Sequence, residues 1–263
     1  MFTVIASQRA QHQLSHQRAL CEGLAAHGIE TKTSFSENSV DTQKVACWGW
    51  RRGKILRERG HDVLIMERGY IGDRFHYTSL AWNGLNGHAT FPDYPVDNGE
   101  RFALHGGVLK PWNKGGEYAL ILGQVPGDAS LKGRDLVPWY SEMAIQIQQL
   151  TGLGVLFRPH PDLKKKGMVQ NVRNTSPSTG TLQEALEGAA FSVCFNSNAA
   201  VDSILAGVPC VAGDKGTMAW DMCSPSIIDI RRPEREAWAH KLAFTQWSME
   251  EIRSGEALHG IVK

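Results

Sequence analysis

Short apolar runs alternate with helical segments along this chain, and this alternation is the feature that most constrains its fold. Residues 2–6 are apolar and β-branched, and residues 8–27 then carry leucines at helical spacing before Gly28. Two further apolar runs, at 45–47 and 63–66, lie on either side of a basic helical stretch. Strands that alternate with helices favour an α/β fold.

A second alternation begins at residue 118 and runs through most of the remaining chain. Strands are expected at 118–122, 154–158, 191–195 and 208–212, and helices at 137–150, 181–188 and 199–206. Between the two blocks, residues 67–116 are a mixture of glycine, asparagine and aromatic residues that is too long for an ordinary connector. We therefore expect two α/β blocks with a boundary between residues 102 and 117.

Composition and charge exclude several classes of protein. The formal net charge of +1 gives no global field that would recruit nucleic acid, although local basic patches remain open. The five cysteines are scattered without zinc-site spacing, which predicts reduced thiols. The chain begins without the pattern of a signal peptide and contains no membrane span. We expect a cytoplasmic protein, in the host cytoplasm if a phage encodes it.

Three polar residues separate an apolar strand from a helix in the second block. Asn196, Ser197 and Asn198 begin the helix, where unpaired N–H groups and the helix dipole favour a phosphate. Asp202 lies further into the helix, where a carboxylate would accept hydrogen bonds from ribose hydroxyls. Ordinary N-capping by Asn or Ser, with an exposed Asp, is the alternative.

Two other turns follow predicted strands. Arg158 and His160 lie in Arg-Pro-His-Pro, where the prolines limit the freedom of the loop and present His160 at the carboxyl edge of the sheet. Open α/β sheets bind ligands at that edge, which favours donor-phosphate binding over a structural histidine. Gln124, Asp128 and Ser130 lie in a glycine- and proline-rich turn after the strand at 118–122, and the alternative is a simple turn.

Together these segments resemble the bacterial capsular polysaccharide Kdo transferase family. That family has Gly-Gln-Val-x-x-Asp-Ala-Ser after a strand, then Pro-His-Pro, then a Ser-containing loop that opens a helix with an acidic residue. A Gly-x-Pro-x-x-x-Gly stretch follows, here at 207–213, before a tryptophan, here Trp220. The N-terminal half adds Trp-Gly-Trp at 48–50 and Glu-Arg-Gly-Tyr-Ile at 67–71, similar to the family's Trp-Gly-Trp and Glu-Asp-Gly-Phe-Ile. The motifs keep the family's order.

The resemblance implies an α/β fold of the GT-B type, with two Rossmann-like domains that face a central cleft. We place the N-terminal, acceptor-side domain at 1–110 and the C-terminal, donor-binding domain at 111–263. The resemblance also implies a nucleotide-sugar donor, UDP- or CMP-linked, transfer to a hydroxyl, and no metal or other cofactor. The donor-binding residues that we predict are Gln124, Ser130, Arg158, His160, Asn196, Ser197, Asn198, Asp202 and Lys215.

The chain departs from the family at two positions. Arg68 stands where the family's aspartate would supply a catalytic base, and Asp202 stands where the family usually has Glu. If the chemistry is kept, the base must lie elsewhere, and we favour Asp73 slightly over Glu67. Either carboxylate is alternatively an ion-paired surface group. His160 completes the predicted catalytic set.

The acceptor is the most open part of the prediction. The loop at 74–87 combines aromatic, amide and arginine side chains, and 51–59 and 164–166 add basic surface, a mixture suited to stacking a base and contacting phosphates. The alternative is that these charges are solvated faces and that Trp82 is a core residue. By analogy with phage GT-B enzymes that glucosylate hydroxymethylated pyrimidines, we expect a 5-hydroxymethylcytosine-type DNA acceptor. The alternatives are a surface or capsular glycan acceptor, and a catalytically inactive sugar-nucleotide- or glycan-binding protein. The predicted acceptor-binding residues are Arg74, His76, Tyr77, Trp82, Asn83 and Asn86.

Overall fold

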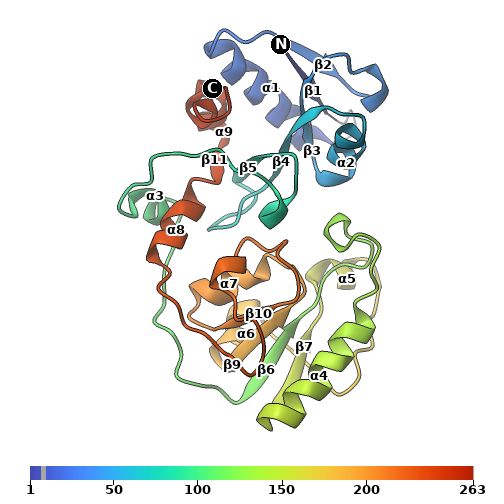
Figure 1. The fold of residues 1–263 in the computed structure, drawn as a ribbon, viewed down its shortest axis with the longest axis vertical. Coiled ribbons are helices and arrows are strands. Elements are labelled where there is room, and N and C mark those ends of the chain that lie inside the picture. The colour runs from blue at the N-terminus through green and yellow to red at the C-terminus, as the bar shows by residue number, and fades with distance from the viewer. Residues whose placement is uncertain (7–9, 263) are drawn as a thin grey trace. The chain divides into compact units, whose positions relative to one another are not determined.

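The computed structural model describes residues 1–6 and 10–262, except for the side chain of Lys164. The chain forms two compact units, each with its own sheet (Figure 1). Unit 1 contains the described residues of 1–107 and of 239–263, and unit 2 contains Val108–Trp238. The expected C-terminal domain at 111–263 is therefore corrected, because its last segment returns to unit 1.

The sheet of unit 1 has six strands in the order β11-β5-β4-β3-β1-β2. The strands β1, β2, β3 and β4 are mutually parallel, whereas β5 and β11 join the β4 edge in antiparallel pairings. The strand bounds are β1 Phe2–Ile5, β2 Thr31–Ser34, β3 Lys44–Trp48, β4 Asp62–Arg68, β5 Tyr77–Trp82 and β11 Gln246–Ser248.

Helices cover both faces of this sheet. The even-numbered residues of β4, Leu64 and Met66, share a core with α1 and α9, and the odd-numbered Val63 and Ile65 share another with α2. Gly23 lets α9 approach α1, because a Cβ there would lie 2.0 Å from the carbonyl oxygen of Ile252. The helices are α1 Gln11–Ala26, α2 Trp50–Glu58, α3 Glu100–Leu104, α8 Glu236–Ala243 and α9 Met249–Ser254.

Unit 2 is built on five parallel strands in the order β10-β9-β6-β7-β8. Its core includes the fully buried Tyr140 of α4, and that helix ends at Gly152, whose φ of 72° is one that glycine adopts without strain. The strands are β6 Tyr118–Leu122, β7 Gly154–Arg158, β8 Ser176–Pro177, β9 Ala189–Cys194 and β10 Cys210–Ala212. The helices are α4 Val137–Thr151, α5 Pro161–Lys165, α6 Leu182–Glu187 and α7 Ala199–Leu205.

The apolar runs and helical segments expected from the sequence are confirmed in both units. The helix expected at 8–27 is α1 from Gln11 onwards, and Gln8 lies outside the described residues. Gly28 has the positive φ of a helix-ending glycine. The segment 67–116 is not wholly irregular, because it contains β5 and α3.

Two further features of the described residues concern the cysteines and the length of the helices. All five cysteines are free thiols, as expected. No helix in the described part of the chain has the length and apolarity needed to cross a bilayer.

Candidate functional site

The carboxyl ends of four strands of unit 2 meet at one edge of its sheet. Leu122 of β6 lies opposite both Arg158 of β7 and Cys194 of β9, and Cys194 lies opposite Ala212 of β10. The turns that follow these strands carry Gln124, His160, Asn196 and Lys215. In open α/β sheets this edge is where ligands bind.

Gln124 and Asn196 form a reciprocal pair across this edge. Gln124 Nε2 donates to Asn196 Oδ1 at 2.7 Å, and the Asn196 backbone N–H donates to Gln124 Oε1 at 3.0 Å. Both residues are buried, and the Gln124 backbone N–H donates to the hydroxyl of Tyr140 at 3.0 Å. The pair fixes the turn after β6 against the turn after β9.

The same network reaches two further turns. Asn196 Nδ2 donates to the carbonyl oxygen of Ser130 and to Asp214 Oδ1, both at 3.1 Å. The Ser130 hydroxyl donates to Asp128 Oδ1 at 2.7 Å. Because the amides of Gln124 and Asn196 are buried and bonded to protein, we infer that these two residues position the turns. Their predicted direct contact with a donor stays a prediction.

His160 is half-buried at the start of α5. Its Nδ1 accepts the backbone N–H of Asp162 at 3.2 Å, so the neutral ring carries its proton on Nε2. Burial lowers the pKa of His160, and the charges of Asp162 and Asp128 partly oppose that shift. A neutral His160 therefore presents an N–H donor beside the Asp128 turn.

The Arg158 guanidinium binds backbone carbonyl oxygens of the segment before α6. Its Nη2 donates to the carbonyl oxygen of Gly180 at 2.9 Å, and its Nη1 donates to that of Thr179 at 3.4 Å. These carbonyls precede α6 and follow β8, the edge strand next to β7. These two bonds orient the guanidinium, and the predicted contact of Arg158 with a donor phosphate stays a prediction.

The remaining predicted donor residues surround the start of α7 and the turn after β10. The Ser197 hydroxyl accepts the backbone N–H of Ala199 at 3.2 Å, and Asn198 Oδ1 accepts that of Met218 at 3.1 Å. Asp202 lies half-buried in the first turn of α7, and Lys215 is exposed. Ser197 thus satisfies one N–H group at the start of α7, and its predicted contact with a donor stays a prediction.

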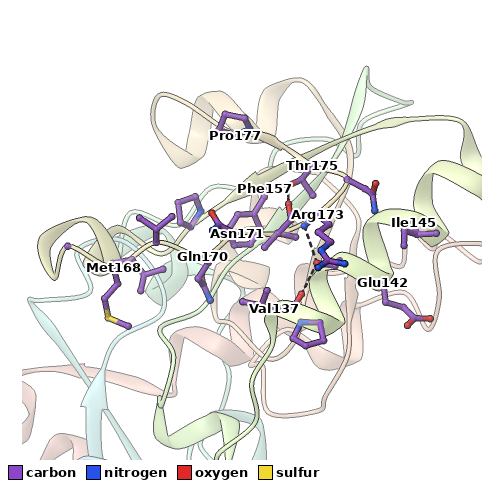
Figure 2. Close-up of a pocket in the computed structure, with 18 residues that line it drawn as sticks. Val137, Glu142, Ile145, Phe157, Met168, Gln170, Asn171, Arg173, Thr175 and Pro177 are labelled. Atoms are coloured by element: carbon purple, nitrogen blue, oxygen red, sulfur yellow. Dashed lines mark hydrogen bonds between the residues drawn. The ribbon is translucent and has the colours of Figure 1, made fainter.

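A separate cavity of 1290 Å³ opens between α4 and the segment 167–175 (Figure 2). Val137 and Glu142 of α4, Phe157 of β7, and Gln170 and Arg173 of the covering segment line it. The lining is mainly apolar. Of the described residues that line the cavity, none belongs to the predicted donor set.

The predicted acceptor residues of unit 1 fall at two different edges of its sheet. Thr78 lies opposite Arg68, and the Gly69 N–H donates to the carbonyl oxygen of Tyr77 at 3.0 Å, so the loop at 73–77 lies at the carboxyl end of β4. Trp82 lies opposite Leu64, towards the start of β4. The structure therefore brings Arg74, His76 and Tyr77 together and separates them from Trp82.

Two of the predicted acceptor asparagines take part in internal bonds. Asn83 Oδ1 accepts the backbone N–H of Val63 at 2.7 Å, and Asn86 Oδ1 accepts the hydroxyl of Tyr70 at 3.0 Å. Both asparagines have positive φ values, 59° and 50°. These contacts give Asn83 and Asn86 structural roles in holding the loop after β5.

The two candidate bases differ in their surroundings. Asp73 is exposed, and its Oδ1 accepts the backbone N–H of Phe75 at 2.9 Å. Glu67 lies on the face of β4 that α2 covers, whereas Arg68 lies on the face that α1 covers. Of the two, Asp73 is the more open to solvent, at the carboxyl edge of the sheet.

Sequence reasoning missed two histidines near this edge. His12 and His16 lie four residues apart on α1, and both rings contact the ring of Trp48. The spacing of four was visible in the sequence, but their partner lies on β3. No group of three or more His, Cys, Asp or Glu side chains within residues 1–6 and 10–262 is arranged to hold a metal ion.

Comparison with known proteins gives structural relatives only. No protein-family model matches the sequence, and no curated protein matches it. The β-Kdo 2,7 transferase of KpsC from Thermosulfurimonas dismutans superposes with a TM-score of 0.59 at 15% identity, covering 97% of this chain and 98% of that one. The β-Kdo 2,4 transferase of the same organism's KpsC gives 0.56 at 14% identity, covering 90% and 89%. The expected fold class is thus confirmed, and the chain is an α/β protein with two Rossmann-like units and the GT-B fold of the KpsC Kdo transferases.

Proposed function

We propose that this protein transfers a sugar from a nucleotide-sugar donor to a hydroxyl group, with the donor bound by unit 2. The observation that carries the proposal is the bonded set of turns at the carboxyl edge of that unit's sheet. Gln124, Ser130 and Asn196 hold these turns together, and His160 lies beside the Asp128 turn. The arrangement stands on the fold that two Kdo transferase structures share.

His160 is the central donor-binding side chain in this proposal. Its Nε2–H would donate to a phosphate oxygen of the leaving nucleotide, where negative charge increases as the glycosidic bond breaks. The exposed Lys215 follows Asp214, which accepts a bond from Asn196, so the ammonium group would add positive charge near the same turns. The proposal keeps the metal-independent donor binding that the sequence resemblance implies.

The acceptor hydroxyl loses a proton in the transfer, and the proposal assigns that proton to a carboxylate of unit 1. Asp73 is the favoured base because it is exposed at the carboxyl edge. Glu67 is the second choice, since its side chain lies on the α2 face.

The proposed acceptor is a glycan, and the structure gives less support to DNA. Basic residues near α2 that were expected to contact phosphates instead pair with carboxylates: Arg52 with Glu37, Lys54 with Glu58, and Arg57 with Asp62. Trp82, which was expected to stack a base, packs against Phe2 with ring centroids 6.0 Å apart. Paired charges contribute less to the phosphate contacts on which DNA affinity depends.

Donor binding and turnover test the proposal. UDP- and CMP-linked sugars are titrated into the wild-type protein and into the His160→Ala and His160→Gln variants, and donor hydrolysis is followed in parallel. We expect one donor class to bind, and His160→Ala to reduce turnover at least about 10-fold while the fold is kept. His259→Ala, at an exposed histidine of unit 1, is the matched control and should behave as wild type.

Two results would contradict the proposal in different ways. If neither donor class binds the wild-type protein, donor recognition by unit 2 is wrong. Tight donor binding without turnover on any acceptor would favour the inactive sugar-nucleotide-binding alternative. Incubation with labelled donor and either hydroxymethylcytosine DNA or capsule oligosaccharides then identifies the acceptor, and label found in DNA alone would exclude the glycan.

A further inference from the structure

Three cysteines of unit 2 converge at the strands β9 and β10. Cys194 ends β9, Cys210 begins β10, and Cys223 lies in the later segment that pairs with β10. The Sγ atoms of Cys194 and Cys210 are 4.0 Å apart, and the Cys223 thiol also forms a hydrogen bond with Cys210. Cys210 therefore has two thiol neighbours, and the backbone decides which of them it can join in a disulfide.

The backbone places Cys210 directly opposite Cys223. Val211 and Ser224 form a parallel bridge, and the Ser224 N–H donates to the carbonyl oxygen of Cys210 at 2.7 Å. One residue earlier on each segment, Cys210 and Cys223 thus lie in register and share one face. Neighbouring strands are about 4.8 Å apart, which lies within the range of about 4.4–6.8 Å between Cα atoms that a disulfide spans.

Cys194 is the less suitable partner, although its sulfur is close. It lies opposite Ala212, two residues beyond Cys210 along β10. One strand spacing and two residues of rise separate the Cα atoms of Cys194 and Cys210 by about 8 Å, beyond the limit of about 7 Å for a disulfide without backbone movement. These two thiols therefore touch in a geometry that does not suit a bond between them.

Exposure and hydrogen bonding assign the two steps of an oxidation to different sulfurs. Cys223 is partly exposed, whereas Cys194 and Cys210 are 0% exposed, so a small oxidant reaches Cys223 first. Hydrogen bonds from Cys194 and Cys223 lower the pKa of Cys210, although burial opposes them, and this favours Cys210 as the nucleophile of the second step. The hydrogen bond to Cys210, followed by burial, raises the pKa of Cys223, so the first step should be slow and need an excess of oxidant.

We propose that Cys210 and Cys223 are a reversible disulfide site that closes residues 210–223 into a covalent ring. Hydrogen peroxide is the oxidant. The Cys223 thiolate attacks one peroxide oxygen, the O–O bond breaks, and the products are a sulfenic acid and a hydroxide that takes up the thiol proton as water. The Cys210 sulfur then attacks the Cys223 sulfur, the S–O bond breaks, and hydroxide leaves with the Cys210 proton as a second water.

The ring would contain the turn after β10. Within that turn Asp214 accepts a hydrogen bond from Asn196 Nδ2 at 3.1 Å, and the Met218 backbone N–H donates to Asn198 Oδ1 at 3.1 Å. A disulfide would therefore tie this turn to β10 beside the bonded turns of the carboxyl edge. Its formation needs no nucleotide sugar, so the site stands or falls separately from the proposed transferase function.

Peptide mapping of the folded full chain tests the site. The protein is treated with excess hydrogen peroxide, and the remaining thiols are blocked with N-ethylmaleimide during denaturation. Cleavage before aspartate then separates Cys194, Cys210 and Cys223 into residues 162–201, 202–213 and 221–228. We expect mass spectrometry to show residues 202–213 linked to 221–228, and a dithiol reductant to remove the link by thiol–disulfide exchange.

Three variants identify the sulfurs. Cys223→Ser should abolish the link, and Cys194→Ser should leave it in place. Cys21→Ser, at a half-buried free cysteine of unit 1, is the matched control and should also leave it. Thermal unfolding shows whether each variant is folded, and the mapping of the wild-type chain decides the question if Cys223→Ser unfolds.

Two results would overturn the disulfide site. One is a link between residues 162–201 and 202–213 in place of the expected one, since Cys194 would then be the partner of Cys210. The other is a wild-type chain in which peroxide leaves Cys210 and Cys223 as thiols, or oxidises them singly, without any link between 202–213 and 221–228.

Discussion

Gln124 and Asn196 exchange two hydrogen bonds across the carboxyl edge of unit 2, although they are 72 residues apart in sequence. Gln124 is 7% exposed and Asn196 is 2% exposed. A buried polar pair stabilises the fold only while both partners are present. If one partner is removed, the remaining buried amide has lost its hydrogen bonds to water and gains none from the protein, which destabilises the folded state. The pair therefore links the fold of unit 2 to the geometry of the proposed donor site.

Removing one amide of this pair should destabilise unit 2. We expect Asn196→Ala to lower the free energy of unfolding by about 1–3 kcal/mol and to weaken donor binding, since the turns lose their connection. Denaturant unfolding of Gln124→Ala, Asn196→Ala and the double variant should reveal a coupling of about 0.5–3 kcal/mol. Gln183→Ala, at an exposed glutamine of α6, is the control, and strict additivity of the two main variants would contradict the pairing.

Arg101 anchors the C-terminal segment to unit 1. The arginine is 8% exposed and is paired with Glu251, its Nε donates to the carbonyl oxygen of Ala243 at 3.0 Å, and its guanidinium lies 4.0 Å from the ring centroid of Trp247. Arg101→Ala would leave the Glu251 carboxylate without its partner, so we expect a loss of about 3–5 kcal/mol in denaturant unfolding.

An exposed ion pair provides the comparison for Arg101. Arg231 and Asp229 of unit 2 are 60% and 49% exposed, and Asp229→Ala should cost less than about 1 kcal/mol. Equal losses from Arg101→Ala and Asp229→Ala would show that Arg101 does not anchor the segment.

His105 should make unit 1 less stable in acid. Burial, followed by the charge of Arg101, lowers the pKa of His105 from 6.5 to about 4, with His76 acting in the same direction and Glu251 and Asp97 opposing. Since the folded pKa lies below the unfolded value, the stabilisation is complete above pH 6.5 and is lost as pH falls from 6.5 towards 4.

This pH dependence can be measured by denaturant unfolding at pH 7 and pH 5. The contribution of His105 should fall by up to about 2 kcal/mol over that interval. His105→Gln should flatten the profile, whereas His259→Gln, at an exposed histidine, should not. An unchanged slope in His105→Gln would mean that other groups cause the acid sensitivity.

The sequence by itself determined much of the local structure. Apolar runs such as residues 118–122 predicted strands because their pattern is complete within a few residues, and Gly28 marked the end of α1 for the same reason. His160 was expected at the carboxyl edge of the sheet, because a parallel α/β order fixes where the turns that follow strands lie. This local information also supported the correct fold class.

Only the tertiary structure decided which distant groups meet. It returned the segment from Ala239 onwards to unit 1, where the three-residue strand β11 pairs with β5, a contact too short to leave a pattern in the sequence. It turned Arg158 towards Gly180 and placed His12 beside Trp48. These contacts depend on the register and packing of segments far apart along the chain, and no local spacing encodes them.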